Sequence, residues 1–149
     1  MRTRLSVLVL ALALPAAAAA GEDFLMGSVV KSDRWKMDRA NDRELFDGDV
    51  SFRNPRYTLK ADHAAYSRRT KVWDIYGSVY TLRRFDDGSR VEVDCDRSVY
   101  SEGLEEARLR RGALPVRMKY TAPDGRVLRG LSDRADAANA AGRIDFAGA

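Results

Sequence analysis

Apolar and polar residues alternate along most of this chain, and the apolar positions keep one parity over several residues. Phe46, Val50 and Phe52 share a parity, with polar residues between them, and residues 75–81 and 144–148 follow the same rule. A period of two places alternate side chains on one face of a β-sheet. No stretch shows a helical period. The sequence therefore predicts an all-β chain.

An aspartate is followed by a glycine at a nearly constant distance, and this happens four times. The pairs are Asp33 with Gly48, Asp62 with Gly77, Asp96 with Gly112, and Asp133 with Gly148, at separations of 15, 15, 16 and 15 residues. After the first three glycines the chain continues as the strand-like segments GDVSF, GSVYTL and GALPV. Repetition at a fixed period indicates a fold built from one recurring unit, here a strand unit.

The parity of the apolar positions flips at the aspartates. Leu59 and Ala61 are in phase before Asp62, whereas Ala64 and Tyr66 are in phase after it. A slip of one residue turns a core face outward unless a bulge or bend compensates. We therefore expect a bulge at each aspartate, with its carboxylate bonding to backbone N–H groups freed from the ladder. The glycines share the parity of the apolar residues, which predicts that they lie on the buried face, where a strand can bend sharply.

Turn signals separate the strand-like segments along the whole chain. Examples are Asn54-Pro55, the triplet 86–88 and the triplet 123–125, and successive signals lie about 13–20 residues apart. This spacing exceeds an ordinary strand, so each leg is expected to be a long strand bent in the middle. Residues 135–141 are interpreted as a strand end and turn rather than a helix. The predicted fold is an antiparallel β-jellyroll, a meander of two curved sheets that face each other like the sides of a taco.

The first twenty residues have the layout of a secretory signal peptide. Arg2 and Arg4 precede the apolar run Leu5–Leu14, and small residues fill Ala16–Ala20 before the expected cleavage site. The apolar run is too short to be a typical transmembrane helix, although a retained N-terminal anchor is the alternative. No later stretch is apolar enough to cross a membrane. We expect an exported protein with a signal peptide at 1–20 and one domain at 21–149, without a transmembrane segment after cleavage.

The charge and the single cysteine narrow the possible partners. Loss of Arg2 and Arg4 with the signal peptide lowers the formal net charge from +4 to +2, which weakens the case for a polyanion partner. Basic clusters at 68–71, 83–84 and 108–111 suit phosphate groups, yet nearby acids favour a solvated surface of mixed charge. They lack interleaved aromatics, so nucleic acid is not an expected partner. One cysteine cannot form an internal disulfide, so the core and the strand pairing must hold the fold.

The inventory of reactive side chains argues against an enzyme. His63 is the only histidine and Cys95 the only thiol, and no hydrolase, zinc-protease or redox motif occurs. His63 follows a bend aspartate and is expected at an exposed bulge. Cys95 takes the place that Ala61 has in the preceding unit, which predicts a small buried side chain. We therefore expect no catalytic residues, no metal and no cofactor.

These patterns leave two interpretations of the inner face of the predicted sheets open. It can be a closed core, which every β-sandwich has, or a groove lining that accepts acyl chains. The residues expected there are Trp35, Met37, Phe46, Val50, Phe52, Leu59, Ile75, Val79, Val91, Val93, Leu114 and Val116. The last unit has no returning strand, so Ile144, Phe146 and Gly148 are expected to form an edge open to a partner strand.

The segment Ser32–Asp62 resembles the OstA-type domain of the LptA family of lipopolysaccharide-transport proteins. It contains an opening Ser-Asp followed by Trp35 and Asp38, then the strand Phe46–Val50, then Leu-Lys-Ala-Asp at 59–62 with a small residue and an aromatic after it. The pattern recurs more loosely, so that the resemblance covers about residues 28–148.

The resemblance implies a twisted β-jellyroll that is not an enzyme. It implies a periplasmic protein that carries lipopolysaccharide, with the lipid A acyl chains in the apolar interior. Protomers of this family stack head to tail by strand pairing and link an LptC-type partner to an LptD-type partner. LptC-type proteins share the fold but keep a membrane helix, so the cleavable signal favours the soluble member. The alternative is a module that caps or joins β-edges without carrying lipid.

Overall fold

A computed structural model describes residues 29–139 and 141–148, and the expected signal peptide lies outside this part of the chain. Every strand pair is antiparallel, and within the described residues no helix is long and apolar enough to span a bilayer. The strands are β1 (Val29–Lys31), β2 (Arg34–Asp38), β3 (Arg43–Arg53), β4 (Tyr57–Ser67), β5 (Val72–Arg84), β6 (Arg90–Ser101), β7 (Glu106–Arg110), β8 (Val116–Thr121), β9 (Val127–Ser132), β10 (Arg134–Ala138) and β11 (Arg143–Ala147).

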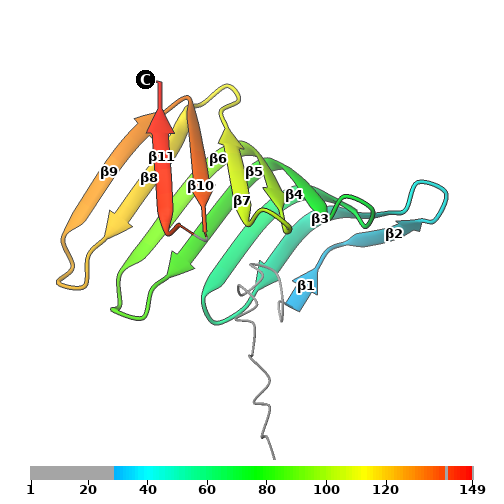
Figure 1. Ribbon diagram of the computed structural model, residues 1–149, viewed down its shortest axis with the longest axis horizontal. Coiled ribbons are helices and arrows are strands. Elements are labelled where there is room, and N and C mark those ends of the chain that lie inside the picture. The colour runs from blue at the N-terminus through cyan, green and yellow to red at the C-terminus, as the bar shows by residue number, and fades with distance from the viewer. Residues whose placement is uncertain (1–28, 140, 149) are drawn as a thin grey trace, which may run out of the picture.

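The strands form a meander that is folded along a line through its middle. β3 to β6 cross the fold line as continuous strands, whereas β1 and β2, β7 and β8, and β9 and β10 are pairs of short strands interrupted there. One layer contains β2, β7, β10 and β11 with one half of each long strand, and the other contains β1, β8 and β9 with the remaining halves. In Figure 1, β10 and β11 stand in front of the layer that contains the slanted β8 and β9, and β7 stands beside β10. This arrangement confirms the predicted jellyroll of bent strands.

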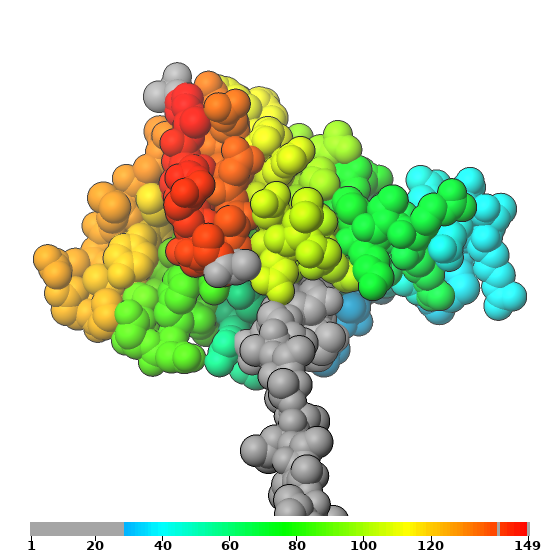
Figure 2. Space-filling model, viewed as in Figure 1, coloured from blue at the N-terminus to red at the C-terminus, as the bar shows by residue number. Residues whose placement is uncertain are grey.

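The ends of the meander do not pair with each other, so the two layers stay open at both ends. Within the described part of the chain, β1 and β2 pair only with β3, β9 pairs only with β8, and β11 pairs only with β10. Figure 2 shows the N-terminal β2–β3 hairpin projecting at one end and the C-terminal strands covering the opposite end. The described strands thus form one folded sheet that does not close on itself.

The bend lies where the sequence placed it, but the extra residue belongs to the other strand. Asp47 is opposite His63 and Val50 is opposite Ala61, so that Gly48 and Asp49 together face one residue of β4. β5 repeats this geometry against β6 at Gly77 and Ser78. The prediction of a bulge at each aspartate is therefore corrected: at these two bends the bulge is on the glycine strand, and the aspartate is the single residue facing it. Left-handed backbone at Gly48 (φ 79°) and Asp49 (φ 44°) produces the local bend.

The aspartate of each repeat packs over the glycine that follows it in the sequence pattern. A Cβ placed on residue 48 would lie 2.5 Å from Oδ2 of Asp33, and Asp33 also donates its backbone N–H to the carbonyl oxygen of Gly48 at 2.8 Å. Equivalent close approaches join Asp96 to Gly112 and Asp133 to Gly148. The constant spacing therefore reflects a packing requirement, because the carboxyl group occupies the space that a side chain at the glycine would fill.

The glycines are less deeply buried than the alternation predicts. Gly48, Gly77 and Gly112 are half-buried at the fold line, and Gly148 is exposed beside the last strand. The core lies between the layers, next to the fold line rather than upon it. Its buried members are Val50, Phe52, Leu59, Ala61, Ala64, Trp73, Ile75, Val79, Val93, Cys95, Tyr100, Leu109, Val116 and Ala135.

Candidate functional site

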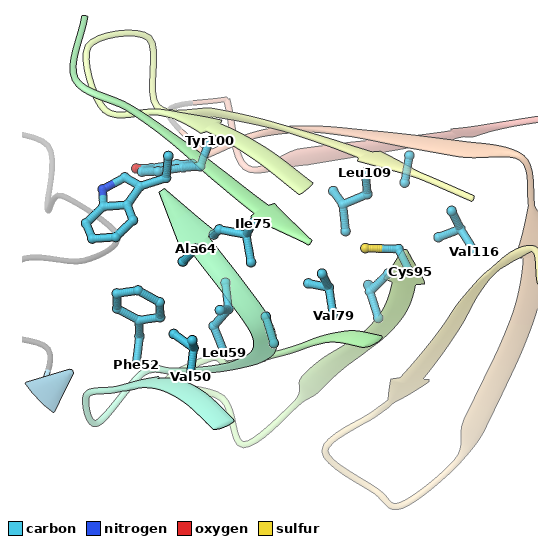
Figure 3. Packing of buried hydrophobic residues seen from close by; sticks show 14 residues of the cluster. Val50, Phe52, Leu59, Ala64, Ile75, Val79, Cys95, Tyr100, Leu109 and Val116 are labelled. Atoms are coloured by element: carbon cyan, nitrogen blue, oxygen red, sulfur yellow. The ribbon is translucent and has the colours of Figure 1, made fainter. Parts of the chain in front are cut away.

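The space between the two layers is the candidate site, and much of the predicted lining lies there. Val50, Phe52, Leu59, Ile75, Val79, Val93 and Val116 are all 4% exposed or less. Figure 3 shows side chains of the two layers pointing toward one another, with Leu109 facing Val79 and Ile75 above Leu59. Phe46 and Val91 are half-buried and pack against this cluster. Alternation alone was sufficient to find these residues, because each sits on a regular strand.

Two predicted lining residues extend the inner face beyond the core. Trp35 lies directly opposite Phe46 and therefore shares its face, yet 58% of its surface is exposed. Met37 lies on the same face of β2 and is 38% exposed. Among the described strands, β2 pairs with β3 alone. The inner face thus ends in exposed apolar side chains.

Leu114 does not belong to the inner face. It lies in the irregular connection between β7 and β8 and is 64% exposed, whereas Val116, two residues later, is fully buried. The sequence left both residues as candidates for the inward position after Gly112. The next strand begins at Val116, and Leu114 lies in the irregular segment before it. The alternation of inward and outward side chains, counted from Gly112, therefore does not predict which way Leu114 faces.

An aromatic cluster joins the layers at the N-terminal half of the interior. The ring of Phe52 contacts the ring of Trp73 edge-on, with centroids 4.9 Å apart, and Tyr66 stacks on Trp73 at 4.6 Å. Glu102 accepts hydrogen bonds from Trp73 Nε1 and from the Tyr66 hydroxyl, both at 3.0 Å. Trp73 is absent from the predicted lining, although its parity with Ile75 places it on the inner face.

The interior holds little free volume in this conformation. A cavity of about 70 Å³ lies among Leu59, Ile75, Val91, Val93 and Leu109. For comparison, an engineered apolar cavity that binds benzene has a volume of about 150 Å³. The centre of the site is therefore a packed core, and any chain-like ligand would require the layers to move apart.

Two polar side chains meet where the cavity reaches the open side of the fold. Arg83 on β5 lies directly opposite Tyr57, and its Nη1 donates a hydrogen bond to Oδ1 of Asn139 at 3.3 Å. Asn139 belongs to the turn that follows β10, so this bond links the two layers. Both side chains line the cavity. The sequence marks Arg83 only as part of a basic cluster, because a contact between residues 56 positions apart leaves no local signal.

Apolar residues are also exposed at the C-terminal end. Leu128 faces inward on β9, opposite Tyr120, and is 61% exposed. Phe146 lies opposite the buried Ala135 and is 38% exposed, and Ile144 packs on the core from the same strand. Gly148 is exposed just after β11. β11 thus has one unpaired side among the described strands, and pairing of a partner strand there stays a prediction.

Of the two reactive residues singled out by the sequence, Cys95 lies in the core and His63 lies on the outer face. Cys95 is 8% exposed, and burial raises the pKa of its thiol from 9.0 to about 12, which keeps it protonated and unreactive at neutral pH. His63 lies on the outer face, in contact with the Asp47 carboxylate and stacked on Tyr76 with ring centroids 5.0 Å apart. Among the described residues no cluster of histidine, cysteine or acidic side chains is arranged to hold a metal ion.

Comparison with solved structures identifies the same architecture in a known protein. The chain superposes on LptH of Pseudomonas aeruginosa, described as the LptA-homologous periplasmic component of the conserved lipopolysaccharide transport device, with a TM-score of 0.66 over 82% of each chain. The chain has the LptA-type fold. Sequence identity across this match is 12%. No family profile matches the sequence, and no curated protein matches it either. The likeness to LptH is therefore one of fold.

Proposed function

We propose that this protein is an exported, non-enzymatic carrier that binds the acyl chains of lipopolysaccharide between its two β-layers. The observation that supports this most directly is the inner apolar face, which runs through the core and stays exposed at both ends. Trp35 is 58% exposed at one end and Leu128 is 61% exposed at the other. A fold that only needed a core would gain nothing by leaving large apolar residues in water at both ends, and such surfaces mark interaction sites.

The fold comparison supports the same proposal. LptH is a periplasmic component of a lipopolysaccharide transport device, and it shares this arrangement of bent strands. A fold alone does not define a function. Combined with the expected signal peptide at residues 1–20, the shared architecture favours a periplasmic location and a role in lipopolysaccharide transport.

We further propose that the exposed ends meet other β-proteins of the same architecture. β11 has an unpaired side among the described strands, and so do β1 and β2. Addition of a strand at such an edge supplies backbone hydrogen bonds, and the exposed apolar residues beside it supply burial. LptC-type and LptD-type proteins, or a second copy of this chain stacked head to tail, are the proposed partners.

Binding must involve separation of the layers, because the present cavity of about 70 Å³ does not accommodate an acyl chain. Among the described residues, strand pairing connects the two layers through β3 to β6 at the fold line, so the open sides can move apart without loss of strand pairing. The contacts that would break are between side chains, such as Phe52 with Trp73 and Arg83 with Asn139. Each methylene group transferred from water into the apolar interior contributes about 0.8 kcal/mol, which offsets the cost of separating side chains that pack between the layers.

Native mass spectrometry of the protein purified from lipopolysaccharide-producing cells tests this proposal. The expected spectrum contains protein with bound lipopolysaccharide or lipid A, together with multiples of the protein mass that grow with concentration. A matched preparation of Leu128→Asp, which places a charge on an exposed part of the inner face and leaves the buried core unchanged, should carry less lipid. Bare protein alone, including after incubation with added lipopolysaccharide, would contradict carriage of the lipid.

A second candidate is an interaction module that joins β-edges without carrying lipid. The small interior volume is the observation that favours it, since a packed core suffices to hold the edges in place. The two candidates differ in one result: the module assembles with partners or with itself but takes up no lipopolysaccharide. Sedimentation at several concentrations, with and without added lipopolysaccharide, separates them.

A further inference from the structure

Among the described residues that line the otherwise largely apolar interior cavity, Arg83 is the cation. It lies on the inner face of β5, opposite Tyr57, in line with residues such as Val79 on the same strand. Its guanidinium carbon is 4.8 Å from the centroid of the Phe85 ring and 5.5 Å from that of Tyr57. The two aromatic rings hold the cation at the open side of the cavity, half-buried.

The partners of Arg83 differ from those of most arginines in the fold. Arg97, Arg110 and Arg111 each have a carboxylate oxygen within 3.0 Å. Arg83 has the neutral amide oxygen of Asn139 at 3.3 Å, and no carboxylate of the described residues forms an ion pair with it. A guanidinium carries five N–H donors, so most of its capacity is unused by this contact.

The acids on the neighbouring β5–β6 turn have other partners. Asp86 lies 3.8 Å from Nη2 of Arg56, and Asp87 accepts hydrogen bonds from the backbone and hydroxyl of Ser89. These bonds to Ser89 lower the pKa of Asp87, so it remains charged and held within the turn. The positive charge of Arg83 is therefore not neutralised by the loop nearest to it.

We propose that Arg83 binds the anionic group of an amphiphile whose hydrocarbon chain enters the interior. The planar guanidinium matches a carboxylate or a phosphate through two parallel hydrogen bonds, and partial burial strengthens them. The anion replaces the amide oxygen of Asn139, so binding of the head group also breaks the contact that links the two layers there. This inference rests on the proposed function, because it requires that the interior accept a hydrocarbon chain.

A matched pair of fluorescent probes tests the role of the charge. cis-Parinaric acid carries a carboxylate, whereas its methyl ester has the same polyene chain without the charge, and both fluoresce more strongly in an apolar site. Both are titrated into the full mature chain, into Arg83→Gln and into the control Arg84→Gln. Arg84 is the next residue, is exposed, and donates to Thr58 at 3.3 Å on the opposite face. Thermal unfolding verifies that each variant is folded.

Arg83→Gln should weaken binding of the acid about tenfold or more and leave the ester unchanged, because one charge-assisted pair is lost. Arg84→Gln should change neither, and Arg83→Lys should restore part of the affinity for the acid. Equal losses for acid and ester, or no loss for either, overturn the role of Arg83 while the carrier proposal stands. Absence of binding for both probes to the unaltered protein overturns the carrier proposal and this inference together.

Competition then identifies the source of the anion. Oleate and a monoacyl glycerol phosphate are compared as displacing ligands for the bound acid, with inorganic phosphate as the chain-free control. Stronger displacement by the monoacyl phosphate assigns the site to phosphate-bearing lipids, and stronger displacement by oleate assigns it to carboxylates. Displacement by inorganic phosphate alone at similar concentration would contradict the requirement for a chain.

Discussion

The carboxyl group of Asp62 occupies the space where a side chain of Gly77 would lie: a Cβ at residue 77 would be 2.7 Å from Oδ2 of Asp62. Gly77 also has a φ of 81°, a left-handed conformation in which side chains are strained. Each repeat thus combines an acid that fills a bend with a glycine that leaves room for it. The two residues fold the sheet over and so create the space between the layers.

Gly77→Ala should lower the free energy of unfolding by about 2 kcal/mol or more, since it adds a steric clash to the left-handed penalty of about 1–2 kcal/mol. Gly88→Ala is the matched control. Gly88 has a similar φ of 86°, but nothing lies within 4 Å of an added Cβ. Urea unfolding measures both variants, and Gly88→Ala should show the conformational penalty alone.

Asp62→Gly in the Gly77→Ala background should recover part of the lost stability, because it removes both the carboxyl group and the Cβ that the new methyl would meet, at 2.7 and 2.8 Å. A double-mutant cycle gives the coupling between the two sites, expected at about 1 kcal/mol. Additive effects of the two substitutions would show that the acid and the glycine act independently, against a packing origin of the repeat.

Phe52→Ala should destabilise the fold by about 3–5 kcal/mol, because a fully buried ring that joins the layers is lost. Phe52 is 1% exposed and contacts Trp73 across the interior. Trp35→Ala removes a larger aromatic that is 58% exposed, so its cost should stay within about 0.5 kcal/mol. Similar losses for the two variants, measured by chemical denaturation, would mean that Trp35 is part of the folding core.

Trp35→Asp should weaken self-association more than Lys36→Asp does, although both place an acid on β2. Trp35 is on the apolar inner face, opposite Phe46, whereas Lys36 is on the outer face, opposite Leu45. A charge on the inner face opposes burial by a stacked partner. Sedimentation velocity at increasing concentration measures the effect. Equal behaviour of the two variants would argue against an interface that continues the inner face.

Cys95 should not react with an aromatic disulfide reagent at pH 8 until the protein is unfolded. Its pKa in the folded state is about 12, against 9.0 as its usual value, owing mainly to burial. The folded pKa is the higher one, so the stability contributed by the protonated thiol is complete below pH 9 and is lost as the pH rises toward 12. The free energy of unfolding of Cys95→Ala should therefore fall less steeply over this range than that of the unaltered protein. Identical slopes would contradict the burial of the thiol.

The sequence predicted the parts of this fold that depend on neighbouring residues. Alternation found Val50, Phe52 and Ile75, and the constant Asp-to-Gly spacing located the bends. The spacing did not show which of two paired strands carries the extra residue of the bulge. The position of the extra residue depends on the register between the strands, as at Gly48 and Asp49. Leu114 was misplaced because an irregular connection interrupts the parity.

The polar contacts of the candidate site could be identified only from the structure. The bond from Arg83 to Asn139 depends on how the layers face each other, and neither residue lies in a motif. The choice between groove and core was likewise beyond the sequence, because the same inward residues serve both. The structure shows a packed centre with exposed apolar ends, which fits a carrier that must open to load.

Photo-crosslinking from the interior, in cells that make lipopolysaccharide, tests whether the protein carries lipid between its layers. A benzophenone amino acid at Tyr57 lies on the inner face beside the cavity, and the same group at Thr58 lies on the outer face of the same strand. Lipid carriage between the layers predicts a lipopolysaccharide adduct from position 57 and little or none from position 58. No adduct from position 57 in the folded protein, or equal adducts from both positions, would contradict it.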